Sequence, residues 1–427
     1  MDTEAMAPET TEERIVWVGL SWTYAFYLIG ALYLAGPVIG WLLVLTMVKR
    51  LLSTEQPFRV PAPAMVWIIG MLTMLVCIIV GHILQGLGTG QLIKSSIGWA
   101  KGWALLAIFI LAGATLNIRP ELIARAAMRV CLHTLCLLPL FVAAWILRLP
   151  ETPYVSPLKI IGGPGPEFFA MSLYELDPQS GMPRWRLFTP WAPALGFVAN
   201  IFFLLAFVEQ DKKWRRIGVC ASVAMILMSQ SRLAILVLLL LIGVMFTLKY
   251  FKGPLLAFAA MVASLLFAFF GGWVLETLGY TYESIKSARA DSTRVRAALG
   301  RIAVHRWQSE APVWGHGVVE RGPHLVEYMP IGSHHSWYGL LFVKGVVGFA
   351  ALAIPLATSI FILGWRAIRR PGIERTGFFC TLMLFLYTFG ENLEILAYLI
   401  WPGLLCIGIA HKPDLGPDIT NNQEIPS

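Results

Sequence analysis

The chain has 427 residues, of which 57% are hydrophobic and only 14% are Asp, Glu, Lys or Arg. In soluble globular proteins about a quarter of the residues are charged, so the composition excludes an ordinary soluble protein and indicates a bilayer as the solvent. The net charge of +8 does not indicate nucleic acid as a partner, because surplus Lys and Arg in a membrane protein mainly orient its helices.

The chain is polar at both ends and apolar in between. The acidic segment 1–15 lacks the basic start of a signal peptide and is predicted to be a cytosolic tail. The Pro-containing segment 412–427 is predicted to be a second, disordered tail. Since a spanning helix needs about 20 apolar residues, we predict about twelve spans, the first two separated at Gly36 and Pro37. They lie at 16–34, 37–53, 62–84, 95–116, 122–146, 188–208, 216–230, 231–249, 254–276, 336–365, 375–391 and 394–410.

Basic residues alternate along the loops between these spans. With the N-terminus in the cytosol, every second loop should be basic, and the loops near 49–50, 119–129, 211–216, 249–252 and 366–375 all carry Lys or Arg. The pattern predicts an all-α polytopic membrane protein with both termini inside. Its transmembrane parts are an N-terminal bundle, central helices and C-terminal helices, at 16–146, 188–276 and 336–411. Two long loops, at 147–187 and 277–335, then lie on the periplasmic side.

The second long loop is cationic although the positive-inside rule disfavours such a loop there. Its segment 292–308 has an amphipathic pattern and predicts a helix at the membrane interface. Arg294 and Arg296 open this helix. Either side chain could bind lipid headgroups or a phosphate group of a ligand, and their spacing does not decide between them.

A polar break separates two predicted helices at 229–232, with the sequence Ser-Gln-Ser-Arg. An arginine at this depth is costly unless it is paired or serves a ligand. Arg232, after Ser231, either extends toward the headgroups or provides a fixed cation for a phosphate. Its planar guanidinium suits the second role, because it can hold two phosphate oxygens at once.

Two adjacent histidines, His334 and His335, precede the long apolar helix predicted at 336–365. We expect Ser333 or a neighbour to cap this helix and both histidines to lie in its first turn, about 100° apart, so that they cannot share one role. A neutral imidazole there can accept a proton.

Two carboxylates, Glu391 and Glu394, lie at a predicted turn on the same side of the membrane. We expect them to pair with the arginines of the second loop or to orient a catalytic Arg or His. Neither long loop contains an acidic cluster, so we expect no metal with oxygen ligands. The sequence also lacks the glycine patterns of nucleotide and dinucleotide sites, and we expect no cofactor.

In this order the motifs resemble the O-antigen ligase and polymerase superfamily of bacterial inner-membrane glycosyltransferases. That family has an Arg after a Ser in a mid-chain helix pair, then a large periplasmic loop. The loop ends in His-Asn/Ser/Gln, followed nine residues later by Gly-x-x-Gly. Here 230–232, 334–335 and 344–348 correspond, and 186–196 is similar to the family's segment before the preceding span. Two features depart from the pattern: His335 replaces the small polar residue, and the loop Arg lies farther from Pro312. The family's His lies eleven residues, or about three helical turns, before the first glycine, and His334 has this spacing to Gly345, whereas His335 and Ser336 reproduce the family's dipeptide. The resemblance favours His334 as the functional imidazole, because helix rotation determines what the side chain can reach.

The resemblance implies a GT-C-like glycosyltransferase of lipopolysaccharide biosynthesis, in contact with inner-membrane lipids and active on the periplasmic face. The donor would be a glycan on undecaprenyl pyrophosphate, and the acceptor of a ligase would be the lipid A-core oligosaccharide. Transfer would be metal-independent and would invert the anomeric centre, since no nucleophile for a covalent intermediate stands out. The implied site comprises the pyrophosphate-binding residues Arg232, Arg294 and Arg296, the catalytic residues His334 and His335, and the supporting residues Ser231, Glu391 and Glu394.

Two other functions fit the same sequence less well. An O-antigen polymerase or related oligosaccharyltransferase would use a second carrier-linked glycan as acceptor. The cationic second loop favours a ligase, because that loop could meet the phosphorylated lipid A core. A transporter of lipid-linked glycans would predict charged residues within the spans and internal repeats, and neither is evident.

Overall fold

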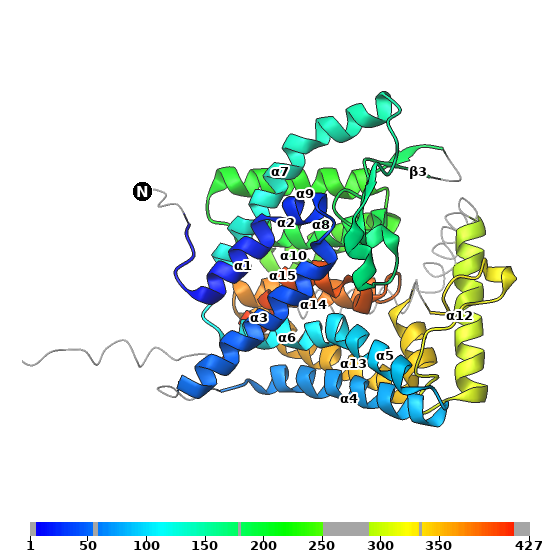
Figure 1. The fold of residues 1–427 in the computed structure, drawn as a ribbon. Coiled ribbons are helices and arrows are strands. Elements are labelled where there is room, and N and C mark those ends of the chain that lie inside the picture. Colours follow the sequence, from blue (N-terminus) through cyan, green and yellow to red (C-terminus); the bar gives the residue numbers. More distant parts are fainter. Residues whose placement is uncertain (1–5, 54–58, 178–180, 251–289, 333–334, 414–427) are drawn as a thin grey trace, which may run out of the picture.

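The computed structural model describes residues 6–53, 59–177, 181–250, 290–332 and 335–413. Nearly all of their regular structure is helical, and most of the long helices run in one general direction, horizontal in Figure 1. Within these ranges seven helices are long and apolar enough to cross a membrane. The chain is therefore an all-α polytopic membrane protein, as the composition predicts. The span predicted at 254–276 lies outside the described residues.

The first half of the chain forms a group of helices that enclose part of the core. Its long members are α3, α4 and α7, and the span predicted at 62–84 has these bounds in α4. The helices are α1 (Thr11–Ser21), α2 (Thr23–Leu28), α3 (Leu32–Ser53), α4 (Ala62–Leu84), α5 (Thr89–Lys101), α6 (Trp103–Thr115) and α7 (Pro120–Ile146).

The second half contains the candidate site. Helix α12 stands across one end of the bundle, at the right of Figure 1, whereas α10 and α14 run along the bundle. Its helices are α8 (Ala192–Ala206), α9 (Lys212–Ser229), α10 (Arg232–Tyr250), α12 (Ala290–Glu310), α13 (Ser336–Arg369), α14 (Ile373–Tyr387) and α15 (Leu393–Ala410). The helix predicted at 292–308 is thus confirmed as α12.

Two predicted boundaries differ from the structure. The break between the first two segments lies at Gly30, whose φ of +69° suits glycine, and α3 runs on through Pro37. The prediction of a break at Gly36 and Pro37 was wrong, because membrane helices tolerate a proline where neighbouring groups compensate for the lost hydrogen bond. Gly36 instead allows close packing, since a Cβ there would lie 2.6 Å from the Cβ of Tyr398.

The span predicted at 95–116 is also interrupted. Gly102 separates the exposed helix α5 from the buried helix α6 and has a non-helical φ of −123° and ψ of −94°. A Cβ on Gly102 would lie 2.6 Å from the Cγ of Glu394, so the glycine permits α15 to approach.

The centre of the core is formed by α6, α8 and α15, in which nearly every residue is buried. Helices that are apolar on all sides are expected at such a position. Stacked rings join them to each other and to α14: Phe197 lies 3.9 Å from Tyr387, and Phe109 lies 5.4 Å from Trp401, between ring centroids. This rigid centre supports the turns at the end of the bundle.

The first long loop contains short antiparallel strand pairs that sequence analysis did not predict. Strand β1 (Tyr154–Val155) pairs with β2 (Ala170–Met171), and β3 (Glu175–Leu176) pairs with β4 (Pro183–Arg184). Short 3-10 helices occur at Pro157–Ile161, Pro166–Phe169 and His324–Val326. The hairpin with β3 and the helix α12 lie at the same end of the bundle (Figure 1).

Candidate functional site

The turn between α14 and α15, residues 388–392, is the point at which the candidate residues meet. Ser336, the first residue of α13, donates its backbone N–H to Thr388 O at 2.9 Å and its hydroxyl to Glu391 O at 2.7 Å. The same hydroxyl accepts from the N–H of Leu393 at 3.1 Å. These three bonds fix the start of α13 against the 388–392 turn.

His335 lies directly before this anchored residue and is the N-cap of α13. Its backbone is extended, with φ −159° and ψ 113°, and its ring accepts from the N–H of Tyr338 at 3.5 Å. The expectation that both histidines lie in the first turn is therefore wrong for His335. The ring stacks on Tyr338 at 4.0 Å and meets Phe389 of the 388–392 turn edge-on at 5.8 Å. Ser333 and His334 lie outside the described residues.

The surroundings of His335 define its protonation. Burial lowers the pKa of the imidazole to about 4, so the ring is neutral at neutral pH. Because Nδ1 accepts from Tyr338, the ring proton is placed on Nε2. In this tautomer His335 offers a hydrogen-bond donor to a ligand and has no free lone pair for use as a base.

Helix α13 is broken at Gly345, which has φ 64° and ψ −165°. Segment 312–317 of the second loop lies at the break and replaces the missing helical bonds. Four backbone bonds join the two: His316 N to Phe342 O (2.9 Å), Gly317 N to Val343 O (2.9 Å), Val346 N to Pro312 O (3.0 Å) and Val347 N to Val313 O (3.3 Å).

This break removes the basis of the rotation argument for His334. The count of turns from His334 to Gly345 assumes a continuous helix, but His335 is extended and Gly345 is not helical. A Cβ on Gly345 would lie 2.2 Å from Val313 O, so the glycine admits a loop backbone and not a neighbouring helix.

A polar clamp holds α12 against the first part of α13. The ring of Phe342 stacks on the imidazole of His316 at 4.2 Å, and the guanidinium of Arg306 lies over the same ring at 5.1 Å. His316 Nε2 and Arg306 Nη2 contact the same oxygen of Glu310, at 2.8 and 2.7 Å. His316 and Arg306 of the second loop thus have structural partners, and they set the position of α12.

Of the four arginines of α12, Arg296 acts through its charge on the 388–392 turn. Glu391 is 4% exposed and accepts from Trp191 Nε1 at 3.0 Å. Burial raises the pKa of its carboxyl to about 7, while the positive charge of Arg296 and the Trp191 bond oppose this effect. The exposed Arg296 therefore lies within electrostatic reach of the turn, which spacing alone could not establish.

Arg232 begins α10 beside the same turn. Its neighbour Leu233 lies so near to Gly390 that a Cβ on that glycine would be 2.6 Å from Leu233 Cδ2. Ser231 accepts from the N–H of Ala234 at 3.3 Å and thus caps α10. The exposed guanidinium and the helix N-terminus together suit an anion.

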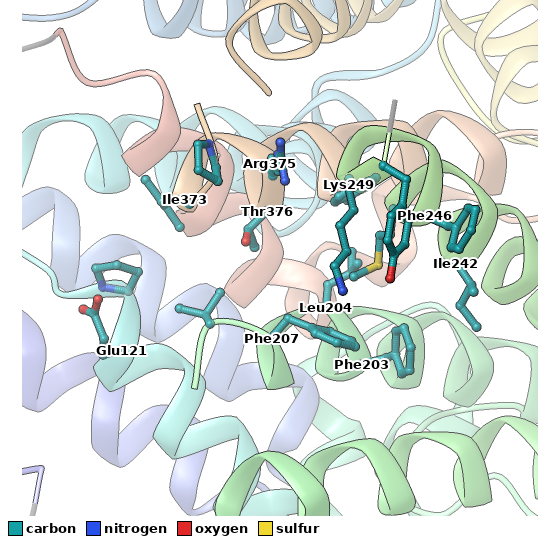
Figure 2. Close-up of a pocket in the computed structure, with 17 residues that line it drawn as sticks. Glu121, Phe203, Leu204, Phe207, Ile242, Phe246, Lys249, Ile373, Arg375 and Thr376 are labelled. Carbon is teal, nitrogen blue, oxygen red and sulfur yellow. The ribbon is translucent and has the colours of Figure 1, made fainter. Parts of the chain in front are cut away.

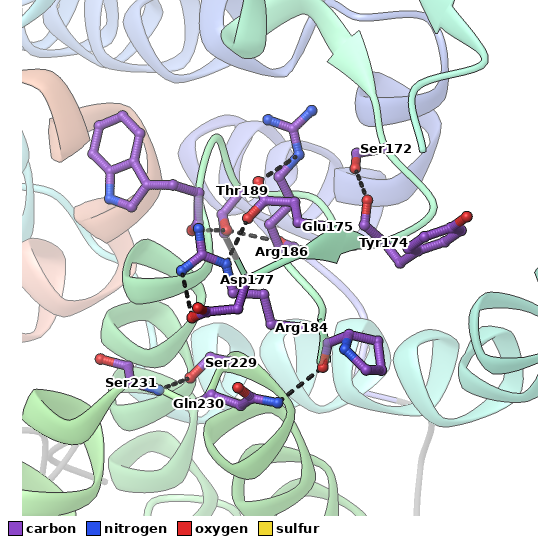
Figure 3. Close-up of polar contacts among 12 residues, drawn as sticks. Ser172, Tyr174, Glu175, Asp177, Arg184, Arg186, Thr189, Ser229, Gln230 and Ser231 are labelled. Carbon is purple, nitrogen blue, oxygen red and sulfur yellow. Dashed lines mark hydrogen bonds and ion pairs between the residues drawn. The ribbon is translucent and has the colours of Figure 1, made fainter. Parts of the chain in front are cut away.

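A polar cluster from the first long loop supports the α9–α10 turn (Figure 3). Gln230, with a left-handed φ of 50°, donates to Pro183 O at 2.8 Å. Arg184 pairs with Glu175 at 3.1 Å and with Asp177 at 3.7 Å. Sequence analysis did not single out these loop residues, because it did not predict the β3–β4 hairpin that brings Arg184 to Glu175, and because Pro183 and Gln230 lie 47 positions apart.

Arg186 is a further residue that sequence reasoning missed. It is 5% exposed, donates to Pro190 O and lies 3.5 Å from Glu175, while its Nε has no hydrogen-bond partner in the described part of the chain. Its presence in the family-like segment 186–196 was the available signal.

The remaining candidates are placed apart from the 388–392 turn. Glu394, in the first turn of α15, lies against Gly102, and its charge acts on Tyr33. No ion pair between Glu394 and an arginine occurs among the described residues. Arg294 is exposed on α12. Within the described ranges no three His, Cys, Asp or Glu residues form a group that could hold a metal.

The fold defines a multi-pass membrane protein with candidate arginines and a candidate histidine at one end of a helical bundle. Residues 217–353 match the family model described as O-antigen ligase. This match confirms the family resemblance seen in the motifs, and it supports an enzyme of the O-antigen ligase or polymerase type. The matched segment contains Arg232, Arg296 and His335. No curated protein matches the chain.

Proposed function

We propose that the chain is an O-antigen ligase that transfers a glycan from undecaprenyl pyrophosphate to the lipid A-core oligosaccharide. The reaction takes place at the periplasmic face of the inner membrane. The observation that carries the proposal is the position of the 388–392 turn, which lies beside the start of α10 at Arg232, contacts His335 through Phe389 and holds Glu391 within reach of the charge of Arg296. Arg232, Arg296 and His335 belong to the segment that matches the family.

The reaction needs little covalent help from the protein, because pyrophosphate is already a good leaving group. The acceptor hydroxyl oxygen bonds to the anomeric carbon while the bond from that carbon to the pyrophosphate oxygen breaks. The electron pair leaves with the pyrophosphate. Arg232, Arg296 and the Nε2–H of His335 stabilise the developing charge, which is the largest contribution that such a site can make. The hydroxyl proton goes to His334 in this proposal, and the displacement inverts the anomeric centre.

Glu391 and Trp191 act as positioning residues in this scheme. The carboxyl attracts Arg296 toward the 388–392 turn, and Trp191 Nε1 orients the carboxyl. Neither residue needs to touch the substrate. Ser336 adds to the arrangement by anchoring the helix that His335 caps.

A choice of acceptors tests the proposal. Purified full-length protein receives a carrier-linked glycan together with either lipid A-core or a second carrier-linked glycan, in the presence of excess EDTA. We expect glycosylated lipid A-core as the product. Extension of only the second carrier would identify a polymerase instead. Activity that is lost in EDTA and restored by Mg²⁺ or Mn²⁺ would contradict the arginine-based mechanism, and transfer to neither acceptor would contradict ligase and polymerase alike.

A further inference from the structure

A cavity of about 600 Å³ lies at the end of the bundle opposite to the candidate site (Figure 2). Helix α10 runs from Arg232 at the site to Lys249 at the cavity. Helix α14 runs from Ile373 at the cavity to Tyr387 at the 388–392 turn. The cavity therefore belongs to the other membrane surface and has no part in the proposed reaction.

One wall of the cavity is apolar. Phe203 and Phe207 of α8 face Ile242 and Phe246 of α10, and Phe379 of α14 completes the wall. Phe207 and Phe246 are 47% and 57% exposed, so a hydrocarbon chain can reach both rings. A wall of this kind suits a hydrocarbon chain.

Cationic and hydroxyl groups line the remainder of the cavity. Lys249 lies in the last turn of α10, and its described contact is with the ring of Tyr250 at 5.0 Å. Arg375 donates through Nε to Ala367 O at 2.9 Å and through Nη2 to Leu248 O at 3.2 Å, which fixes the orientation of its guanidinium.

Thr376 lies next to Arg375 and is only 8% exposed. It lines the cavity, and its hydroxyl has no hydrogen-bond partner among the described residues. The hydroxyl can therefore bond to a polar group of a ligand in the cavity. Glu121 is the one carboxylate among the lining residues, against two cations.

We propose that this cavity binds one anionic glycerophospholipid from the surrounding membrane leaflet. Lys249, Arg375 and the hydroxyl of Thr376 would hold the phosphate, and one acyl chain would lie along the phenylalanine wall. The volume is typical of small-molecule sites, which enclose about 300–1,000 Å³. Basic pockets between transmembrane helices bind anionic lipid headgroups, and the apolar wall distinguishes a lipid from free phosphate.

The binding test uses the full chain in detergent, with native mass spectrometry as the readout. Phosphatidylglycerol and phosphatidylcholine are offered at equal concentration, and inorganic phosphate is offered alone. We expect one phosphatidylglycerol per chain, bound in preference to phosphatidylcholine, and no displacement by millimolar phosphate. Lys249→Gln should weaken phosphatidylglycerol binding about fivefold, because one cation near a membrane contributes about 1 kcal/mol.

Two matched pairs of variants separate this site from general lipid adhesion. Lys213→Gln removes an exposed cation of α9 that does not line the cavity, and it should leave binding unchanged. Ile242→Trp should fill the cavity and abolish retention of the lipid. Leu239→Trp places the same bulk on α10, at a residue that is 65% exposed and outside the cavity, and it should have no effect.

Equal binding of the two lipids by the unaltered protein would overturn the proposal. Ile242→Trp protein that retains phosphatidylglycerol as well as the Leu239→Trp protein would also overturn it. Displacement of the lipid by inorganic phosphate would show that the cavity binds phosphate and not a lipid, and it would overturn the proposal as well. Because the readout is binding and not transfer, these outcomes are independent of the ligase proposal.

Discussion

Arg294 and Arg296 are two residues apart on α12, and this separation places them on opposite sides of the helix. Each residue of an α-helix is rotated by about 100°, so side chains two positions apart point about 200° apart. The charge of Arg296 acts on Glu391 in the 388–392 turn. The geometry therefore favours Arg296 as the second pyrophosphate ligand, beside Arg232.

Replacing Arg294 and Arg296 one at a time tests this choice. We expect Arg296→Gln to lower the initial rate of glycan transfer about a hundredfold or more, the usual effect of removing a donor that stabilises transition-state charge. Arg294→Gln keeps the same helix and removes the same charge, and it should lower the rate less than tenfold. Rates are measured in membranes with matched protein levels. A larger loss in Arg294→Gln than in Arg296→Gln would show that the other face of α12 meets the substrate.

A second prediction concerns the shape of the cation at Arg232. A lysine retains the charge but cannot hold two phosphate oxygens in a fixed plane. Arg232→Lys should therefore lose nearly as much transfer activity as Arg232→Ala, while both variants are inserted at normal levels. Near-normal transfer by the lysine variant would mean that Arg232 only meets lipid headgroups.

Glu391 makes stability depend on pH in a defined direction. Burial raises the pKa of this carboxyl from 4.5 to about 7, so the folded protein holds the proton more tightly than the unfolded chain. The resulting stabilisation is fully present below pH 4.5 and is lost as pH rises through about 7. Each pKa unit corresponds to about 1.4 kcal/mol.

Glu391→Gln retains an oxygen acceptor for Trp191 and cannot ionise. Its thermal unfolding temperature in detergent should change less between pH 4.5 and 7.5 than that of the unaltered protein. The comparison between the two proteins cancels the titration of other groups. If both proteins lose the same stability over this interval, the carboxyl of Glu391 does not titrate as proposed.

At the scale of elements, the break in α13 organises the site. Segment 312–317 forms four backbone hydrogen bonds with α13 around Gly345. The contacts of Phe342 with His316 and Arg306 hold α12 beside this segment. The second loop is thus joined to a membrane helix through its backbone. This connection determines how far Arg296 can move from the 388–392 turn.

Gly345→Ala should weaken the backbone hydrogen bonds between segment 312–317 and α13. An alanine at φ 64° and ψ −165° is strained by about 1–3 kcal/mol, and its Cβ would collide with Val313 O. We expect a lower unfolding temperature and faster proteolysis of the second loop. Gly243→Ala in α10 is the control, because its Cβ would meet no atom within 4 Å and alanine favours a helix. Equal behaviour of the two variants would contradict the role of the break.

The sequence predicted apolar helices well and predicted their interruptions poorly. The bounds of α4 follow from its uninterrupted apolar run, since a bilayer determines the length of such a helix. The breaks at Gly30, Gly102 and Gly345 depend on which backbone approaches each glycine, and that partner is distant in the chain. Motif order singled out Arg232, His334 and His335 as candidates. The bond from Trp191 to Glu391 joins residues 200 positions apart, and no local pattern predicts it.

On the scale of the whole molecule, the two long loops share one end of the bundle. Polar residues of the first loop support the start of α10, and the second loop reaches the start of α13. Both loops must therefore lie on the same side of the membrane as the site. The basic loops near 211–216 and 366–375 are predicted to lie on the opposite side.

Cysteine labelling tests this arrangement in a background without the exposed native residues Cys136 and Cys220. Cysteines at Tyr154 and Val319, which are 42% and 57% exposed, should react with an impermeant reagent added to the periplasm. A cysteine at Lys213 should react only after the membrane is opened. Periplasmic labelling at Lys213 would reverse the orientation and place the site in the cytosol.

The break in α13 also limits how natural or designed relatives can be recombined. Gly345 and segment 312–317 complete each other's backbone hydrogen bonds, so they form one unit of exchange although they are separated along the chain. A chimera that takes the second loop from one parent and α13 from another would combine a loop segment and a helix break that come from different sequences. Crossover points before residue 290 or after residue 350 keep the pair intact, whereas a crossover between 318 and 335 divides it.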